Sequence, residues 1–149
     1  MSWLDRITDF LSTSGPRGGL LLVFPEYRPD LAKAVAHQLG LRFCDFRDEE
    51  MSKLGIEAGS MPLESLNDKI SLLSREEGVL LFNAEALLAT KSSEERSAWM
   101  RELVGHDWPN PVLVPITLFA AEAGGSTARV LCFDADELPE QGVISRLMH

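Results

Sequence analysis

Six polar side chains of this sequence follow, or lie near the end of, apolar runs that have the length of buried parallel strands. Ligands bind beyond the carboxyl ends of the strands in an open α/β sheet, so side chains at these places can converge on one crevice. Acids, an amide, a hydroxyl and a guanidinium that meet there could hold a nucleotide, a metal ion or a small substrate. The six are Glu26, Tyr27, Arg28, Asn83, Glu85 and Thr117.

The segment after the first apolar run lacks the residues that bind nucleotide phosphates. A phosphate-binding loop needs glycines, so that backbone N–H groups can approach the phosphates, and a lysine that reaches their charge. Residues 24–30, FPEYRPD, contain neither, while two prolines remove N–H donors and two acids repel an anion. We therefore expect no catalytic residue and no cofactor here, and binding of ATP with Mg²⁺ is disfavoured.

The end of the third apolar run is equally poor in metal ligands. Asn83 stands where an NTPase carries the acid that holds Mg²⁺, and Glu85 could replace that acid only if the turn redirects it. A solvated acid at the start of a helix, favoured by the helix dipole, is the more ordinary interpretation of Glu85. The three histidines lack metal-site spacing and the two cysteines form no CxxC pair, so we predict no metal site.

The elements that must position these residues alternate between strands and helices. This alternation predicts one three-layer α/β domain over 1–149, with a five-stranded, mainly parallel sheet flanked by helices. It divides into an N-terminal amphipathic helix at 1–14, an α/β core at 19–133 and an acidic tail at 134–149. The predicted strands are 20–24, 41–46, 79–82, 112–119 and 129–133.

Several boundaries are marked by residue type. Ser2 is a helix N-cap and Gly15 with Pro16 ends the first helix, whereas Pro29 opens and Gly40 closes the second. A short helix at 48–54, a loop at 55–62, helices beginning near 63 and 93, and a turn at 124–126 complete the pattern. Pro115 lies inside the fourth predicted strand, so it requires a bulge or an unpaired position there.

The charge balance limits the classes of partner. With 14 basic and 23 acidic residues the net charge is -9, which argues against gripping nucleic acid as the main function. Segments 45–50 and 134–140 supply seven of the nine excess charges, and Asp134, Asp136 and Glu137 of the second are candidate contacts for a basic partner. No apolar run approaches the roughly 20 residues of a membrane helix, so we expect a cytoplasmic protein with no membrane contact.

The cysteines and aromatic residues give weaker expectations. If the strand order is the 5-1-4-3-2 common in P-loop NTPases, Cys44 and Cys132 lie on opposite edges of the sheet, roughly 19 Å apart, and remain free buried thiols. Trp3 and Trp99 have the spacing of core residues. Tyr27, in a loop between two charged residues, is the aromatic side chain whose place is hardest to explain by packing and easiest by a partner.

The order of elements resembles BrxF, the family of small P-loop proteins of type III BREX phage-defence clusters. The matching features are Trp3-Leu4 in an amphipathic start, the run 20–24, a helix closing on Leu39-Gly40, the run 79–82 followed by Leu87-Leu88, and the acidic segment 133–136. The resemblance implies a P-loop fold whose phosphate loop, expected at 24–30, is degenerate. It also implies that Asn83 replaces the strand-end acid and that Thr117 occupies the polar sensor position.

From these features we expect a non-catalytic accessory or regulatory subunit of a prokaryotic anti-phage-defence (BREX-like) complex. It would act through contacts with other proteins of a defence or DNA-processing complex, and a second copy of the chain is a further candidate partner. Two alternatives stay open: a small cytosolic enzyme or nucleotide-binding protein that uses the strand-end crevice, and a pseudo-receiver signalling domain. The second rests on five parallel strands with Glu26 and Thr117 after the first and fourth.

Overall fold

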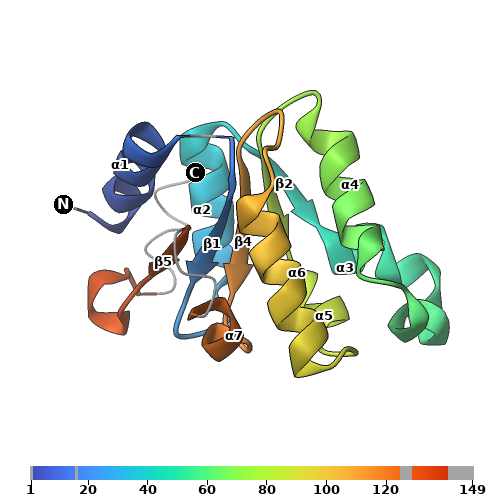
Figure 1. Ribbon diagram of the computed structural model, residues 1–149. Helices are drawn as coiled ribbons and strands as arrows, with labels where there is room; N and C mark the ends of the chain where they lie inside the picture. The colour runs from blue at the N-terminus through green and yellow to red at the C-terminus, as the bar shows by residue number, and fades with distance from the viewer. Residues whose placement is uncertain (1, 16, 125–128, 141–149) are drawn as a thin grey trace.

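The computed structural model describes residues 2–15, 17–124 and 129–140 of the chain. Its strands pair in parallel throughout, in the order β2-β3-β4-β1-β5, and form one sheet (Figure 1). The predicted α/β class with a parallel five-stranded sheet is confirmed. The strands are β1 (Gly19–Val23), β2 (Arg42–Asp45), β3 (Val79–Phe82), β4 (Val112–Ile116) and β5 (Val130–Cys132).

The strand order decides between the topologies considered from the sequence. Read from the β5 edge, it is the 5-1-4-3-2 order, and β1 lies between β4 and β5. In the receiver-like order, 2-1-3-4-5, β1 lies between β2 and β3, so the pseudo-receiver alternative does not fit this sheet. Cys44 and Cys132 lie on the two edge strands, as expected for this order.

The environments of the two thiols differ from the expectation. Cys44 is buried, and burial raises its pKa to about 12. Cys132 is exposed, so the prediction of two buried thiols is wrong for this residue. The reason is its place on β5, a three-residue edge strand that pairs on one side only.

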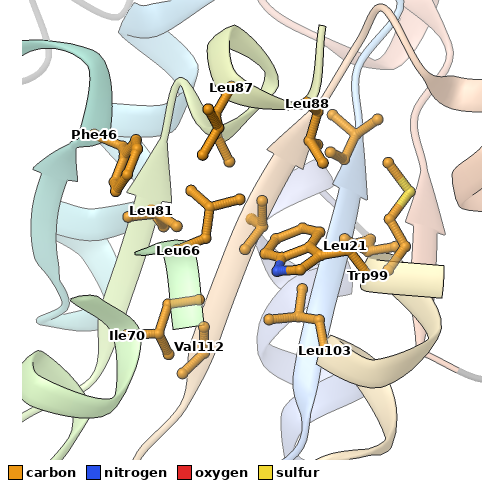
Figure 2. Packing of buried hydrophobic residues seen from close by; sticks show 14 of the residues in the cluster. Leu21, Phe46, Leu66, Ile70, Leu81, Leu87, Leu88, Trp99, Leu103 and Val112 are labelled. Atoms are coloured by element: carbon orange, nitrogen blue, oxygen red, sulfur yellow. The ribbon is translucent and has the colours of Figure 1, made fainter. Parts of the chain in front are cut away.

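Alternate residues of the strands face two apolar layers. In β1, Leu20 and Leu22 pack with α1 (Trp3–Ser14) and α2 (Pro29–Leu39), which lie on one side of the sheet (Figure 1). Leu21 and Val23 pack on the other side, with α4 (Glu64–Ser74) and α6 (Ser93–Gly105). Figure 2 shows this second layer, in which side chains of the helices and of the sheet gather in one cluster around Trp99.

The predicted helix boundaries hold where a capping residue marks them. The backbone N–H of Asp5 donates to the Ser2 hydroxyl at 3.2 Å, and the backbone N–H of Ser2 donates back to the Asp5 carboxylate, which together cap α1. Trp3 and Ile7 of this amphipathic helix are buried. Pro29 opens α2, and Gly40 ends it with a φ of 66° in the left-handed region, a conformation that favours glycine.

The fourth strand is shorter than predicted. It ends at Ile116, whereas the prediction extended it to 119, and a short helix, α7 (Ala120–Gly124), follows between the predicted strand and the predicted turn at 124–126. The Ile116 carbonyl accepts the Phe24 N–H, so Ile116 faces β1 and the preceding residue, Pro115, faces β3. The pairing of β3 with β4 ends at Leu113, so Pro115 takes the unpaired position that the sequence required.

The connections also differ in detail from the expectation. Residues 46–60 form α3 (Phe46–Glu49) and two 3₁₀ helices, η1 (Met51–Lys53) and η2 (Gly55–Ser60), where a helix at 48–54 and a loop at 55–62 were predicted. α5 (Ala84–Leu88) follows β3, and η3 (Ala135–Glu137) begins the acidic tail, whose residues 141–149 lie outside the described part. No helix within the described ranges combines the length and the apolarity needed to cross a bilayer.

The close approach of β1 to α6 yields a stability prediction. A Cβ atom on Gly19 would overlap the backbone carbonyl oxygen of Leu103, whereas a Cβ on Gly105 would meet nothing within 4 Å. Gly19→Ala should therefore lower the free energy of unfolding by about 2 kcal/mol, because the overlap forces the strand and helix apart. Gly105→Ala is the matched control and should be neutral or slightly stabilising. Urea unfolding measures both, and equal effects of the two substitutions would contradict this packing.

Candidate functional site

The start of α2, where a P-loop protein would bind phosphate, is occupied by side chains of the protein itself. Arg28 Nε and Nη2 donate to the two Asp30 carboxylate oxygens at 3.0 and 2.9 Å, which makes a bidentate ion pair. The hydrogen bond raises the pKa of the Arg28 guanidinium and lowers the pKa of the Asp30 carboxyl. Asp30 therefore already supplies the negative charge that the N-terminus of a helix favours.

The C-terminal part of the described chain closes the same place from outside. Arg28 Nη2 also donates to the Pro139 carbonyl at 2.7 Å, and only 9% of the Arg28 side chain is exposed. A cavity of about 280 Å³ remains beside this contact, with the acids Glu26 and Glu140 on its wall. Its charges are unfavourable for a phosphate group, since the one cation, Arg28, is already paired.

The acidic tail is partly used for internal contacts. Arg6 Nη1 donates to Glu137 Oε1 at 2.6 Å, and the Asp134 backbone N–H donates to the same oxygen at 2.9 Å. Both hydrogen bonds lower the pKa of Glu137, and the one from Asp134 has the larger effect. Of the three predicted acidic contacts, Asp134 and Asp136 are exposed, whereas Glu137 holds the tail against α1.

Asn83 links two other strand ends through its side chain. Tyr27 Oη donates to Asn83 Oδ1 at 3.1 Å, and Asn83 Nδ2 donates to Asp45 Oδ1 at 2.9 Å. An amide can accept from one neighbour and donate to the other at the same time, which an aspartate could not do beside Asp45. The backbone of Asn83 is left-handed, with a φ of 63°, a conformation that asparagine tolerates better than most residues.

Contacts with Phe82 and Asn83 account for the orientation of the Tyr27 side chain. Its ring lies 5.4 Å from the ring of Phe82, and its hydroxyl is bound to Asn83, so the side chain has a fixed orientation. About half of it, 53%, is still exposed. It is therefore an ordered aromatic surface at the carboxyl edge of the sheet, available to a ligand or a partner.

Glu85 binds the backbone that follows β4. Its Oε1 accepts the Thr117 N–H at 2.8 Å and its Oε2 accepts the Phe119 N–H at 2.9 Å. Burial raises the pKa of Glu85, and these backbone hydrogen bonds oppose the rise. The sequence predicted that Glu85 is either a metal ligand or a solvated acid at the start of a helix. In the structure it instead accepts the hydrogen bonds that fix the turn after β4.

A second cavity, of about 310 Å³, lies beside Glu85. Of the six predicted side chains, Tyr27, Asn83, Glu85 and Thr117 line it, while Glu26 and Arg28 line the cavity near Pro139. The predicted crevice is thus two separate hollows. Sequence reasoning missed the other residues of this wall, which are Arg47, Ala86 and Leu118. The signal for Arg47 was its position two residues after the end of β2.

The arrangement favours recognition over metal or phosphate chemistry. Within the described ranges, no three His, Cys, Asp or Glu side chains gather as a metal site would require. The other acidic segment, 45–50, is partly neutralised by Lys69, which lies 3.3 Å from Glu49 and 2.9 Å from Glu50. Compared with protein-family models, curated proteins and solved structures, the chain gives no match, so the site is interpreted from its own residues.

The hydrogen bonds of Asn83 predict that replacing this residue by aspartate destabilises the fold. Asn83→Asp would place a carboxylate against Asp45, and we expect it to lower the free energy of unfolding at neutral pH by about 1–3 kcal/mol. Asn67→Asp is the matched control, because Asn67 uses only its carbonyl oxygen, which accepts the Trp99 indole N–H at 2.9 Å. Urea unfolding of both variants distinguishes them. A smaller loss for Asn83→Asp than for Asn67→Asp would contradict the assigned contacts.

Glu85 predicts a pH dependence of stability. Its pKa in the fold lies above the ordinary 4.5, so folding favours the protonated form. The contribution of Glu85 to the unfolding free energy is then fully present below the unfolded-state pKa and is lost as pH rises through the folded pKa. Glu85→Gln does not titrate there. Wild type should lose stability relative to Glu85→Gln as pH rises above 4.5, measured by urea unfolding at several pH values; a difference that moves the other way would contradict this.

Proposed function

We propose that the protein is a non-catalytic α/β module with P-loop-like strand order, whose nucleotide site is closed by its own side chains and which acts through contacts with other proteins. Its setting, in this proposal, is the cytoplasm of a prokaryote, as an accessory or regulatory subunit of a BREX-like anti-phage-defence complex. The resemblance to BrxF supplies that setting. Other proteins of the defence or DNA-processing complex are the proposed partners.

The observation that carries the proposal is the Arg28 ion pair at the start of α2. A working phosphate site needs free N–H donors and a free cation at this place. Here the Asp30 carboxylate accepts two hydrogen bonds from the Arg28 guanidinium, and the Pro139 carbonyl accepts a third. A bound phosphate would have to displace a bidentate, partly buried pair and approach Glu26.

The exposed residues of the same edge support a role in binding proteins. Tyr27 and Leu118 are large side chains that are 53% and 73% exposed beside the 310 Å³ cavity. Aromatic and apolar side chains of this kind supply the main binding energy of many interfaces. The exposed Asp134 and Asp136 add negative charge to the tail, where a basic partner would find complementary charge.

Calorimetry with ATP and Mg²⁺ tests the closed site. We expect no heat of binding at millimolar ATP, because Arg28, the cation that lines the 280 Å³ cavity, is paired with Asp30. A P-loop NTPase with an intact lysine is the positive control. A dissociation constant in the micromolar range would contradict the proposal.

Affinity capture from the native host tests the role in a complex. The protein should retain a defined partner protein, and Tyr27→Ala together with Leu118→Ala should release it. Leu72→Ala is the matched control, because Leu72 is 59% exposed but lies on α4, beside a different hollow that Met61 and Lys69 also line. Retention of the same partner by the Tyr27 and Leu118 variants would remove this edge as the contact surface.

A further inference from the structure

Two side chains of opposite charge line the 310 Å³ cavity without neutralising each other. They are Glu85 and Arg47, which belong to the same set of lining residues. Among the described residues, neither makes an ion pair: the Glu85 carboxylate accepts only backbone N–H groups, and the Arg47 guanidinium has no hydrogen-bond partner. A partly buried carboxylate and a free guanidinium in one hollow are complementary to a ligand that carries both charges.

Both groups retain hydrogen-bonding capacity. A carboxylate offers about four acceptor sites, and Thr117 and Phe119 use one on each oxygen of Glu85. Each oxygen therefore has a further site for a donor such as an ammonium group. Arg47 lies in the first turn of α3 with an exposed side chain, and its planar guanidinium can bind a carboxylate through two parallel hydrogen bonds.

Apart from the polar side chains of Asn83 and Thr117, the rest of the lining is an aromatic ring and two apolar side chains. The Tyr27 ring is fixed by its hydrogen bond to Asn83 and by Phe82 behind it, and Ala86 and Leu118 complete the wall. At about 310 Å³ the cavity is at the lower end of the range of small-ligand sites. It also lies beyond the carboxyl ends of β3 and β4, where open α/β sheets bind their ligands.

These features do not suit a nucleotide. The hollow contains one guanidinium and one carboxylate, so its charges do not favour a polyanion. The backbone N–H groups of Thr117 and Phe119, which could otherwise have bound a phosphate, are already engaged by Glu85. A compact molecule with one positive group, one negative group and an apolar body fits better.

We propose that this cavity binds an apolar α-amino acid, with its ammonium group on Glu85, its carboxylate on Arg47, and its side chain against Tyr27 and Leu118. The inference does not depend on the proposed function, because it concerns a hollow separate from the closed start of α2. The module would then carry a small-molecule site next to its exposed contact residues. Binding there would change the surface that Tyr27 and Leu118 present.

A titration followed by amide chemical shifts tests the ligand class. The probes are L-phenylalanine and its two halves, 3-phenylpropanoate, which lacks the ammonium group, and phenethylamine, which lacks the carboxylate. L-phenylalanine should shift the amide signals of Thr117 and Phe119, because those N–H groups bind Glu85. Each half should bind about tenfold more weakly, since each loses one charge-assisted contact.

The Arg47→Gln variant tests whether Arg47 binds the carboxylate group of the ligand. It should weaken L-phenylalanine and 3-phenylpropanoate about tenfold and leave phenethylamine unchanged, because only the first two carry a carboxylate. Arg101→Gln is the matched control, an exposed arginine of α6 outside the cavity, and should change none of the three. Both substitutions replace exposed side chains, so both variants should fold.

Three results would each overturn the inference. The first is the absence of shifts at Thr117 and Phe119 with millimolar L-phenylalanine. The second is phenethylamine or 3-phenylpropanoate binding as tightly as L-phenylalanine, which would show that the second charge is not recognised. The third is equal binding of L-phenylalanine to Arg47→Gln and Arg101→Gln.

Discussion

The carboxyl edge of the sheet depends on the contact between Glu85 and the backbone after β4. Pro115 ends the pairing of β4 with β3, so the chain beyond Ile116 leaves the sheet with N–H groups that need new acceptors. Glu85 accepts two of them from the adjacent turn. This fixes the segment that contains Leu118, which lines the same cavity as Tyr27, and both side chains are exposed there.

The remaining polar groups of this edge satisfy one another in the same manner. Asn83 joins Tyr27 to Asp45, and Asp30 joins Arg28 to the start of α2, with the Pro139 carbonyl as a third partner. Asn83 thus connects strand ends, whereas Arg28 and Asp30 pair locally at the start of α2. In the proposed function, the cost of breaking these contacts opposes nucleotide binding.

The sequence predicted the fold class because alternation and caps are local signals. The five apolar runs, the Ser2 cap and the Pro29 and Gly40 boundaries all depend on residues close in the chain, and all are observed. The predicted end of β4, at 119, was wrong because Leu118 and Phe119 continue the apolar run in the sequence. Pro115 already limited the pairing of this strand. The prediction that Cys132 is buried was wrong because its exposure results from β5 being a short edge strand, which the sequence pattern does not indicate.

The candidate site was predictable only in part, since its contacts join distant segments. The rule on strand ends located Tyr27, Asn83, Glu85 and Thr117 correctly beside one hollow. It could not predict that Pro139 closes the start of α2, a contact across 111 positions of the chain, nor that α3 turns Arg47 toward the same hollow. Such contacts join segments that are distant in the chain, so no periodic pattern in the sequence indicates them.

The most direct measurement of the central claim is the Arg28 Nε–H signal in a ¹⁵N-edited spectrum, recorded without and with ATP and Mg²⁺. A bidentate, partly buried pair with Asp30 should give a slowly exchanging Nε–H whose position does not change when nucleotide is added. A shift of that signal together with the first amides of α2 on addition of ATP would show that the phosphate site is open, and would contradict the account.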